Sequence, residues 1–350
     1  MLLETSALVI GGGPAGATAA RFLSGAGVDT LLVERDCSYV KPCGGGIPSG
    51  GFNEFHLPQN LIKKKIGRII IVSPGDRRIE INLKGGHLYI TERGVFDQAL
   101  RSLATQNGAS LVEGEFTGFE KAGGAFLSSV RRKDDGEEIS VKSKYIIASD
   151  GITFSAGKNC AFKQPRHLYT ISATMRRFDG DACEFWFGNS HASNYYSWIF
   201  PSNESASIGT GSSNPKELPG LLDNFITRKF GSNMESLSRN NEIDRPKVFP
   251  VPCWRGGPYS HGNVLFLGDA AGMVMPTTYE GIYYAMKSGQ FAATAIIEGR
   301  PDNYRRMLEE RFKYRFLVMS LFRRLFFRSD RTIEKWIRIH EYSAVQEIAC

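Results

Sequence analysis

A glycine-rich turn near the N-terminus has the residue types and the spacing that bind a pyrophosphate. An apolar run at Ala7–Ile10 is followed by Gly11-Gly12-Gly13-Pro14-Ala15-Gly16. The first glycine of such a turn permits the tight bend, a later one lets the backbone touch the phosphates, and the last lets the helix pack on the strand. The pyrophosphate would lie at the helix N-terminus, where free N–H groups favour negative charge. The expected contacts are Gly11, Gly13, Pro14, Ala15 and Gly16.

An acidic residue ends the next apolar run. Glu34 closes the expected strand Val28–Glu34, 18 residues after Gly16. At this place a carboxylate accepts hydrogen bonds from the ribose hydroxyls of a dinucleotide. The strand, glycine turn, helix and acid together predict a dinucleotide-binding βαβ unit, and we include the neighbouring Arg35 among the expected contacts.

Two aspartates follow later apolar strands. Asp150-Gly151 comes after the run Lys144–Ser149, and Gly268-Asp269 comes after the run Asn263–Leu267. A carboxylate at such a strand end can accept hydrogen bonds from ribityl hydroxyls. A helix N-terminus after it favours a phosphate or the electron-rich edge of a flavin. These features favour FAD over NAD as the cofactor.

The segment Lys41-Pro42-Cys43-Gly44-Gly45-Gly46-Ile47-Pro48 contains three successive glycines. In regular structure each would cost about 1 kcal/mol relative to alanine. They make sense where the backbone must lie flat against a planar ring, so we expect this segment beside the flavin.

Several segments resemble those of known flavoproteins, in the same order along the chain. The glycine turn and the pairs Asp150-Gly151 and Gly268-Asp269 resemble the motifs of the FAD-dependent hydroxylase-like fold. Lys41–Pro48 resembles the K-P-C-G-G signature of the geranylgeranyl reductases, and Tyr196–Pro201 resembles their Y-x-W-x-F-P strand. Glu280–Gly289 resembles their flavin-edge helix. The chain therefore resembles the geranylgeranyl reductase family over nearly its whole length.

The resemblance implies further contacts to FAD, among them one beside the adenine, at Phe116. The full set of added contacts is Cys43, Gly44, Gly45, Arg93, Phe116, Gly281 and Ile282. It also implies reduction of isolated carbon–carbon double bonds in a polyprenyl (geranylgeranyl) group on a diphosphate, a pigment or a lipid. Only one dinucleotide fingerprint exists and FAD occupies it, so NADPH or a ferredoxin-type protein is the expected electron donor.

An isolated alkene is not polarised, so a proton must accompany or precede the hydride, and positive charge develops at the tertiary carbon. Aromatic faces stabilise such charge by about 0.5–2 kcal/mol each when desolvated. Tyr196, Trp198 and Phe200 alternate along a strand and so share one face. We expect Tyr196 and Trp198 to line the cavity as catalytic residues and Phe200 to belong to the core.

The proton donor stays open at this level. Cys43, a third catalytic candidate, could donate a proton, form a redox-linked disulfide or merely pack as a buried thiol. Tyr279 and Glu280 are further candidate acids. Met275–Tyr279 stands where small residues are usual in the family, and the stretch 151–195 is short for chlorophyll-pathway members. The substrate's identity is what these departures leave open.

The order of elements predicts an α/β fold: a Rossmann-type, hydroxylase-like FAD-binding domain with an interleaved β-rich substrate domain and a helical C-terminus. We assign residues 1–65, 91–160 and 260–302 to the FAD-binding domain, 66–90 and 161–259 to the β-rich domain, and 303–350 to a basic helical segment.

The cysteine spacing and the hydropathy bear on three further features: a metal site, a signal peptide and a membrane span. Six cysteines occur without a CxxC pair and six histidines are dispersed, so we expect no metal site. A strand begins within the first ten residues and no run of about 18 apolar residues exists, which argues against a signal peptide and a membrane span. We expect a cytoplasmic monomer that binds no nucleic acid.

Residues 303–340 hold 11 lysines and arginines and 4 acidic residues, a surplus that equals the net charge of +7 of the whole chain. One interpretation is an amphipathic helix that covers the core with its arginines in water. The other is a surface that meets anionic lipid, as peripheral membrane contact, or the diphosphate of a prenyl substrate.

Two other functions fit parts of the pattern. A flavin-dependent monooxygenase or halogenase would share the fold, although a halogenase strand resembles W-x-W-x-I-P, where this chain has Tyr196 and Phe200. A membrane-associated electron-transfer flavoprotein dehydrogenase usually adds an iron–sulfur cluster, for which the cysteine spacing gives no ligands.

Overall fold

The computed structural model describes residues 2–342, which form two compact units. Within that range, unit 1 takes in residues up to Val40, Gly94–Arg166 and Pro252–Met319. Unit 2 takes in Lys41–Arg93, His167–Val251 and the residues from Ser320 onward. Residues 41–65, expected in the FAD-binding domain, group with unit 2, and helix α9 (Tyr314–Phe326) belongs partly to each unit.

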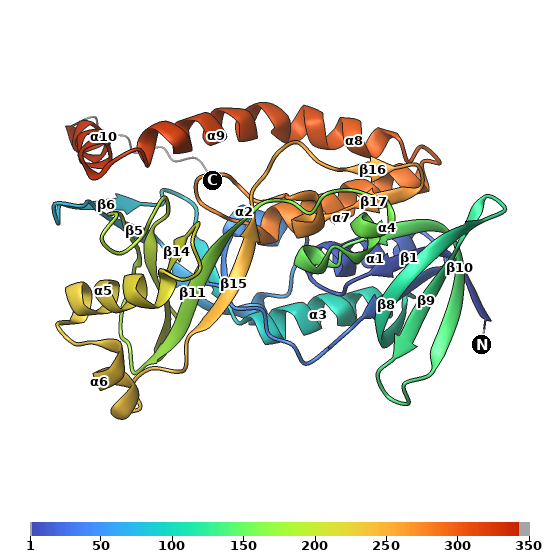
Figure 1. The fold of residues 1–350 in the computed structure, drawn as a ribbon, viewed down its shortest axis with the longest axis horizontal. Coiled ribbons are helices and arrows are strands. Elements are labelled where there is room, and N and C mark those ends of the chain that lie inside the picture. Colours follow the sequence, from blue (N-terminus) through green and yellow to red (C-terminus); the bar gives the residue numbers. More distant parts are fainter. Residues whose placement is uncertain (1, 343–350) are drawn as a thin grey trace. The chain divides into compact units, whose positions relative to one another are not determined.

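Unit 1 is built on a seven-stranded sheet in the order β1-β2-β8-β9-β10-β17-β16, with a further pairing of β1 to β10. Its strands are β1 (Leu2–Ile10), β2 (Thr30–Glu34), β8 (Ser110–Ala122), β9 (Ala125–Arg132), β10 (Glu138–Ala148), β16 (Ser260–His261) and β17 (Val264–Phe266). Strands β8, β2, β1, β10 and β17 pair in parallel in that order, and β9 pairs antiparallel with β8 and β10 (Figure 1). The carboxyl ends of the parallel strands therefore lie at one edge, where nucleotides bind in sheets of this class.

The helices of unit 1 include one pair in very close contact. Helix α1 begins at Pro14, whose fixed φ suits the first helical position, and it is rich in alanine. It packs beside α7, where a Cβ on Gly289 would overlap the carbonyl oxygen of Ala15 (Figure 1). The α-helices assigned to unit 1 are α1 (Pro14–Gly25), α3 (Arg93–Gln106), α4 (Ser155–Asn159), α7 (Ile282–Ile297) and α8 (Asn303–Leu308).

Short helical turns complete this unit. They are the 3-10 turns η2 (Gly151–Thr153) and η3 (Gly268–Ala271) and the π turn η4 (Glu309–Lys313). The apolar core lies between the sheet and these helices, and it includes Tyr304, whose hydroxyl donates a 2.7 Å hydrogen bond to the carbonyl of Phe266.

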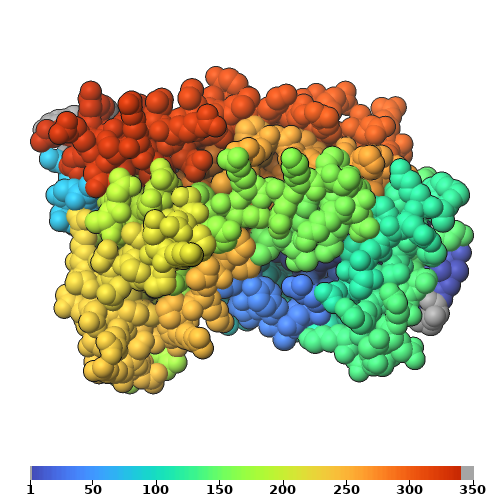
Figure 2. Space-filling view, in the orientation of Figure 1, coloured from blue at the N-terminus to red at the C-terminus, as the bar shows by residue number. Residues whose placement is uncertain are grey.

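Unit 2 contains a second seven-stranded sheet, in the order β15-β11-β14-β13-β12-β5-β6. Its strands are β5 (Arg68–Val72), β6 (Arg78–Asn82), β11 (His167–Arg176), β12 (Cys183–Trp186), β13 (Ser197–Pro201), β14 (Ser205–Ser212) and β15 (Lys247–Pro252). Helix α5 (Leu218–Phe230) packs on β11 and β14 through its apolar face, and with α6 (Met234–Arg239) it forms part of the visible surface (yellow to gold in Figure 2).

A three-stranded sheet, β3-β7-β4, also belongs to unit 2. It consists of β3 (Gly46–Pro48), β7 (Leu88–Thr91) and β4 (Ile62–Ile66), with α2 (Ser49–Glu54) and the turn η1 (Gln59–Leu61) between them in sequence. Helix α10 (Asp330–Tyr342) packs its Ile333 and Ile337 against Ile71 and Ile79 of β5 and β6.

The α/β fold class is confirmed, and the local differences have simple causes. Strand β10 includes most of the expected run Lys144–Ser149 and begins earlier, at Glu138, because the buried Ser143 continues its ladder. Strands β3, β4 and β7 were not expected, since β3 begins at a glycine, β4 contains three lysines and β7 is only four residues long. The expected helical segment 303–350 is helical at 303–326 and Asp330–Tyr342, and 343–350 lie outside the described residues, as does Met1.

Candidate active site

Neighbouring atoms crowd Gly11 and Gly16 of the glycine turn of unit 1, whereas the space beside Gly13 is open. Gly11 has φ +97°, and a Cβ there would overlap the carbonyl oxygen of Ser149. A Cβ on Gly16 would overlap the carbonyl oxygen of Gly11, which is why α1 can sit so close to the strand. A Cβ on Gly13 would meet no atom within 4 Å, and no side chain caps the N-terminus of α1. The turn therefore offers open space and free N–H groups to an anion.

Glu34 is bound into this turn from the end of β2. Its Oε2 accepts a 2.6 Å hydrogen bond from the N–H of Gly12, and its Oε1 accepts a 3.0 Å bond from the N–H of Asp36. A carboxylate has about four acceptor sites, so both oxygens can still accept from ribose hydroxyls. Arg35, the next residue, is exposed.

Arg101 of α3 lies beside the turn and was missed by the sequence analysis. Its side chain is only 6% exposed, and Nη1 and Nη2 donate to the carbonyl oxygens of Gly12 (3.3 Å) and Cys37 (2.8 Å). Both acceptors are uncharged, so the guanidinium brings buried positive charge to the glycine turn. In sequence, an arginine next to Leu100 in an amphipathic helix looks like any surface residue, and no motif marks it.

The pairs Asp150-Gly151 and Gly268-Asp269 meet at the same edge of the sheet. A Cβ on Gly151 (φ +61°) would lie 3.9 Å from Cβ of Asp269, and a Cβ on Gly281 would lie 3.9 Å from Oδ1 of Asp269. The N–H of Gly268 donates a 2.9 Å hydrogen bond to Ser288 of α7, which fixes η3 against that helix. The structure thus brings together residues that are more than 100 positions apart in sequence.

The carboxyl group of Asp150 is half satisfied. Its Oδ2 accepts hydrogen bonds from the N–H groups of Ser155 and Ala156, whereas the buried Oδ1 has no partner within the part of the chain that the structure describes. Burial raises the pKa of Asp150 to about 6, and the two backbone bonds oppose that rise. An orphaned buried oxygen calls for a donor such as a ribityl hydroxyl. With the open turn and the uncapped helix, this edge of unit 1 fits FAD.

Three other residues expected to contact FAD are buried at helix starts or in the core. Ile282 is buried and begins α7, while Arg93 is buried and begins α3. Phe116 lies in the core of unit 1, with its ring centroid 6.4 Å from that of Phe119. Their contacts to FAD stay predictions.

In unit 2, the glycine segment meets the aromatic strand. A Cβ on Gly44 would overlap the ring of Phe200, so the K-P-C-G-G segment lies directly against β13. Gly45 has φ +73° and is held by Thr91, whose N–H and Oγ1 donate to its carbonyl oxygen at 2.9 and 3.1 Å. Cys43 is a free, exposed thiol whose Sγ accepts a 3.3 Å bond from Gly45 N–H, which goes against mere core packing.

Aromatic residues of β12, β13 and the segment before β13 cluster around Phe185, a side chain that the sequence analysis missed. The ring of Phe185 on β12 lies 5.2 Å from those of Tyr196 and Phe200 (centroid distances) and pairs across the sheet with Trp198. Tyr195, also missed, stacks on Tyr196 at 4.8 Å. Nε1 of Trp198 donates a 3.2 Å bond to Ser207, so its indole is fixed. The pairing of β12 with β13, which the sequence does not display, brings Phe185 to the cluster. Tyr195 is the sequence neighbour of Tyr196, and no motif marks their stacking.

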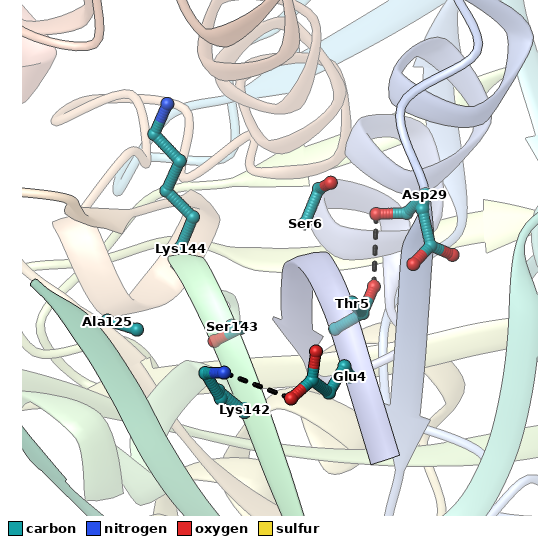
Figure 3. A pocket seen from close by; sticks show the side chains of 8 residues that line it. All are labelled: Glu4, Thr5, Ser6, Asp29, Ala125, Lys142, Ser143 and Lys144. Atoms are coloured by element: carbon teal, nitrogen blue, oxygen red, sulfur yellow. Dashed lines mark hydrogen bonds and ion pairs between the residues drawn. The ribbon is translucent and has the colours of Figure 1, made fainter. Parts of the chain in front are cut away.

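An open depression of about 350 Å³ lies elsewhere on unit 1, at the start of β1 (Figure 3). Glu4 and Lys142 form a 3.0 Å ion pair across it, and Thr5 Oγ1 donates a 3.0 Å bond to the carbonyl of Asp29. The Lys144 side chain extends away from these groups (Figure 3). Because its charges are paired or point to solvent, this depression shows no converging chemistry.

No cluster of His, Cys, Asp or Glu within residues 2–342 could hold a metal ion. Across the same residues, no helix is both long and apolar enough to cross a bilayer.

Comparison with known proteins decides the family. The model of the family described as "FAD binding domain" matches residues 4–298. A digeranylgeranylglycerophospholipid reductase from Methanocaldococcus jannaschii is 31% identical, over 81% of this chain and 75% of its own. The chain belongs to the FAD-binding geranylgeranyl reductase family.

Other members of this family agree. A geranylgeranyl diphosphate reductase from Rhodobacter capsulatus is 28% identical over 96% of this chain and 88% of its own. The structure of a geranylgeranyl bacteriochlorophyll reductase-like protein from Thermoplasma acidophilum matches with a TM-score of 0.86 and 27% identity, over 96% of this chain and 91% of its own. Flavin-dependent halogenases match at 14–18% identity, which shows a shared fold alone.

Proposed function

We propose that this geranylgeranyl reductase family member uses FAD to reduce isolated double bonds of a polyprenyl group on a diphosphate, a pigment or a lipid. The observation that carries the proposal is the contact between Gly44 and Phe200, which joins the two signature segments of the family in unit 2. Named relatives act on geranylgeranyl diphosphate and on digeranylgeranylglycerophospholipid, which supports a polyprenyl substrate here.

Unit 1 would bind the cofactor in this proposal. The amides of the glycine turn and the N-terminus of α1 hold the pyrophosphate, Glu34 accepts from the ribose, and Oδ1 of Asp150 accepts from a ribityl hydroxyl. When bound and reduced, FAD supplies the hydride. Its electrons come from NADPH or a ferredoxin-type donor, and stopped-flow bleaching of the flavin by each would tell them apart.

Unit 2 would hold the polyprenyl chain. The faces of Tyr196 and Trp198 stabilise the positive charge that develops at the tertiary carbon, by about 0.5–2 kcal/mol each. Both side chains are buried within rings that exclude water, which strengthens this attraction. Cys43 lies at the glycine segment with a free thiol, and proton donation or a redox-linked disulfide stays open for it.

Mass spectrometry tests the reaction and the substrate together. Dithionite-reduced protein is incubated anaerobically with geranylgeranyl diphosphate, a geranylgeranylated pigment or an unsaturated ether lipid. A gain of two daltons per reduced bond on one of them is the expected result. Hydroxylated product with oxygen-dependent NAD(P)H consumption would instead indicate a monooxygenase, and reduction of quinone without any mass gain an electron-transfer dehydrogenase.

We also propose that α9 contacts the surface of an anionic membrane. Its exposed apolar side chains follow the i, i+3, i+4, i+7 spacing and so share one outward face: Tyr314, Leu317, Val318, Leu321 and Leu325. Exposed basic residues flank this stripe, among them Lys313, Arg315 and Arg324. Apolar insertion flanked by positive charge is how amphipathic helices bind anionic lipid. A cytoplasmic, membrane-peripheral monomer is the state that this proposal predicts, and sedimentation with and without vesicles checks it.

A further inference from the structure

Glu280 carries a carboxyl oxygen that nothing in the structure satisfies. Its Oε1 is shielded from solvent and has no hydrogen-bond partner among residues 2–342. The residue directly precedes Gly281, which caps α7 and lies 3.9 Å (by its Cβ position) from Oδ1 of Asp269. The orphaned carboxyl therefore lies at the edge of unit 1 where the cofactor-binding groups converge.

The loop that presents Glu280 is closed by its own backbone. The N–H of Met275 donates a 2.9 Å hydrogen bond to the carbonyl of Glu280, and the N–H of Tyr279 donates a 3.0 Å bond to the carbonyl of Met275. Tyr279 has φ +55°, which is uncommon for a residue other than glycine and which concentrates at functional sites. The position of the Glu280 carboxyl is thus fixed by the loop.

Few charges surround this carboxyl. Burial raises the pKa of Glu280 to about 7, and Arg315 of α9 opposes the rise. The neighbouring Tyr284 of α7 has its own pKa raised, first by burial and then by the charge of Glu280, with Arg315, Tyr283 and Arg311 also acting on it. Glu280 therefore holds its proton close to neutral pH, while Arg315 lowers the cost of losing it.

We propose that Glu280 is the acid that protonates the polyprenyl double bond, an inference that rests on the proposed function. The O–H bond of Glu280 breaks as one alkene carbon takes its proton through the π electrons. The other carbon takes the hydride that reduced FAD supplies, and FAD is left oxidised by two electrons. Glu280 is left as a carboxylate beside Arg315 and takes a new proton from water.

The test compares Glu280→Gln with Glu298→Gln, an exposed glutamate that caps the far end of α7. In single turnovers of the reduced protein with geranylgeranyl diphosphate, Glu280→Gln should slow reduction about 100-fold or more, the usual contribution of a general acid. The wild-type rate should fall as pH rises through 7, and the residual rate of the variant should not. FAD affinity should stay unchanged in both variants.

Infrared spectroscopy of the cofactor-free protein gives a second reading that does not need turnover. The difference spectrum of wild type minus Glu280→Gln should show the C=O band of one protonated carboxyl at pH 6, and this band should fade around pH 7. Asp150, whose pKa is about 6, is present in both proteins and cancels in the difference. If the wild type reduces no polyprenyl substrate, the proposed function fails, although the band still reports the proton. If Glu280→Gln turns over at the wild-type rate, or the band is missing at pH 6, the acid role of Glu280 is overturned.

Discussion

Oε2 of Glu34 accepts a 2.6 Å hydrogen bond from the N–H of Gly12, so the acid that ends β2 holds the glycine turn in place. Hydrogen bonds to charged groups contribute about 1.5–3 kcal/mol. We expect Glu34→Gln to weaken FAD binding about tenfold or more, because 1.4 kcal/mol is tenfold in affinity. Titration followed by flavin fluorescence measures this, with the exposed Glu120→Gln on β8 as the control. Equal affinities for the two variants would contradict the role of Glu34.

Two glycines of the turn should respond to alanine in opposite ways. Gly13→Ala adds a methyl group where no atom lies within 4 Å, so the cofactor-free protein should keep its unfolding temperature. The methyl would occupy the space that the pyrophosphate needs, and FAD binding should be lost. Gly16→Ala overlaps the carbonyl of Gly11 and should destabilise the cofactor-free protein by about 1–3 kcal/mol. Calorimetry and FAD titration separate the two effects, and a Gly13→Ala protein that binds FAD normally would show that the pyrophosphate lies elsewhere.

Arg101 should be needed for FAD affinity although no motif contains it. Arg101→Met removes two hydrogen bonds from a charged donor, to Gly12 and Cys37, together with a buried positive charge. We expect FAD binding to weaken by about tenfold or more, and Arg101→Lys to recover part of it. Arg131→Met, an exposed change on β9, is the control in the same titration. Full affinity in Arg101→Met would mean that the charge serves folding alone.

Asp150 should make the stability of the cofactor-free protein depend on pH. Its pKa is raised from the ordinary 3.8 to about 6, so between these values the folded protein holds more protons at this group than the unfolded chain. Its contribution to stability is therefore greatest below about pH 4 and is lost as pH rises through 6. Asp150→Asn keeps an acceptor for Ser155 and Ala156 and removes the titration. Relative to wild type, the variant should gain about 2–3 kcal/mol between pH 4 and 7. Urea unfolding across that range measures the difference, and parallel curves would refute it.

The apolar stripe of α9 should decide membrane binding. Leu317→Glu with Leu321→Glu places charges in the stripe, so co-sedimentation with vesicles rich in anionic lipid should be lost. Wild-type binding should weaken in high salt, because salt screens the basic flanks. Val248→Glu, an exposed apolar position on β15, is the matched control. Binding of the double variant at the wild-type level, or no binding by the wild type at any salt, would end the proposal for α9.

The positions of the glycine turn and of the acids at the strand ends of unit 1 could be predicted from sequence, because they depend on backbone geometry. Gly11 and Gly16 stand where a Cβ would overlap the backbone, so only glycine fits there. The glycines and their spacing can therefore be recognised in the sequence. Glu34 and Asp150 follow apolar strands directly, so their place at the sheet edge is also local information.

Other parts depend on contacts between distant segments. Arg101 points at the turn only because α3 lies beside it, and Phe185 joins Tyr196 only through the pairing of β12 with β13. For α9 the sequence left two interpretations open. The structure has features of both, since Phe316 and Phe326 are buried while Leu317, Leu321 and Leu325 are exposed. The period of the apolar residues predicts a helix, but what packs against each face of that helix is decided by the tertiary structure.

The sheet of unit 1 pairs β1, at the start of the chain, with β10, and β10 with β17 near residue 265. During synthesis, the first strand and the glycine turn must wait on the ribosome until β17 and the start of α7 have emerged. At about 5–20 residues per second, that delay is on the order of tens of seconds. For this interval the apolar β1 and β2 are exposed to aggregation or to chaperones, and FAD can be captured only after β17 and the start of α7 have emerged.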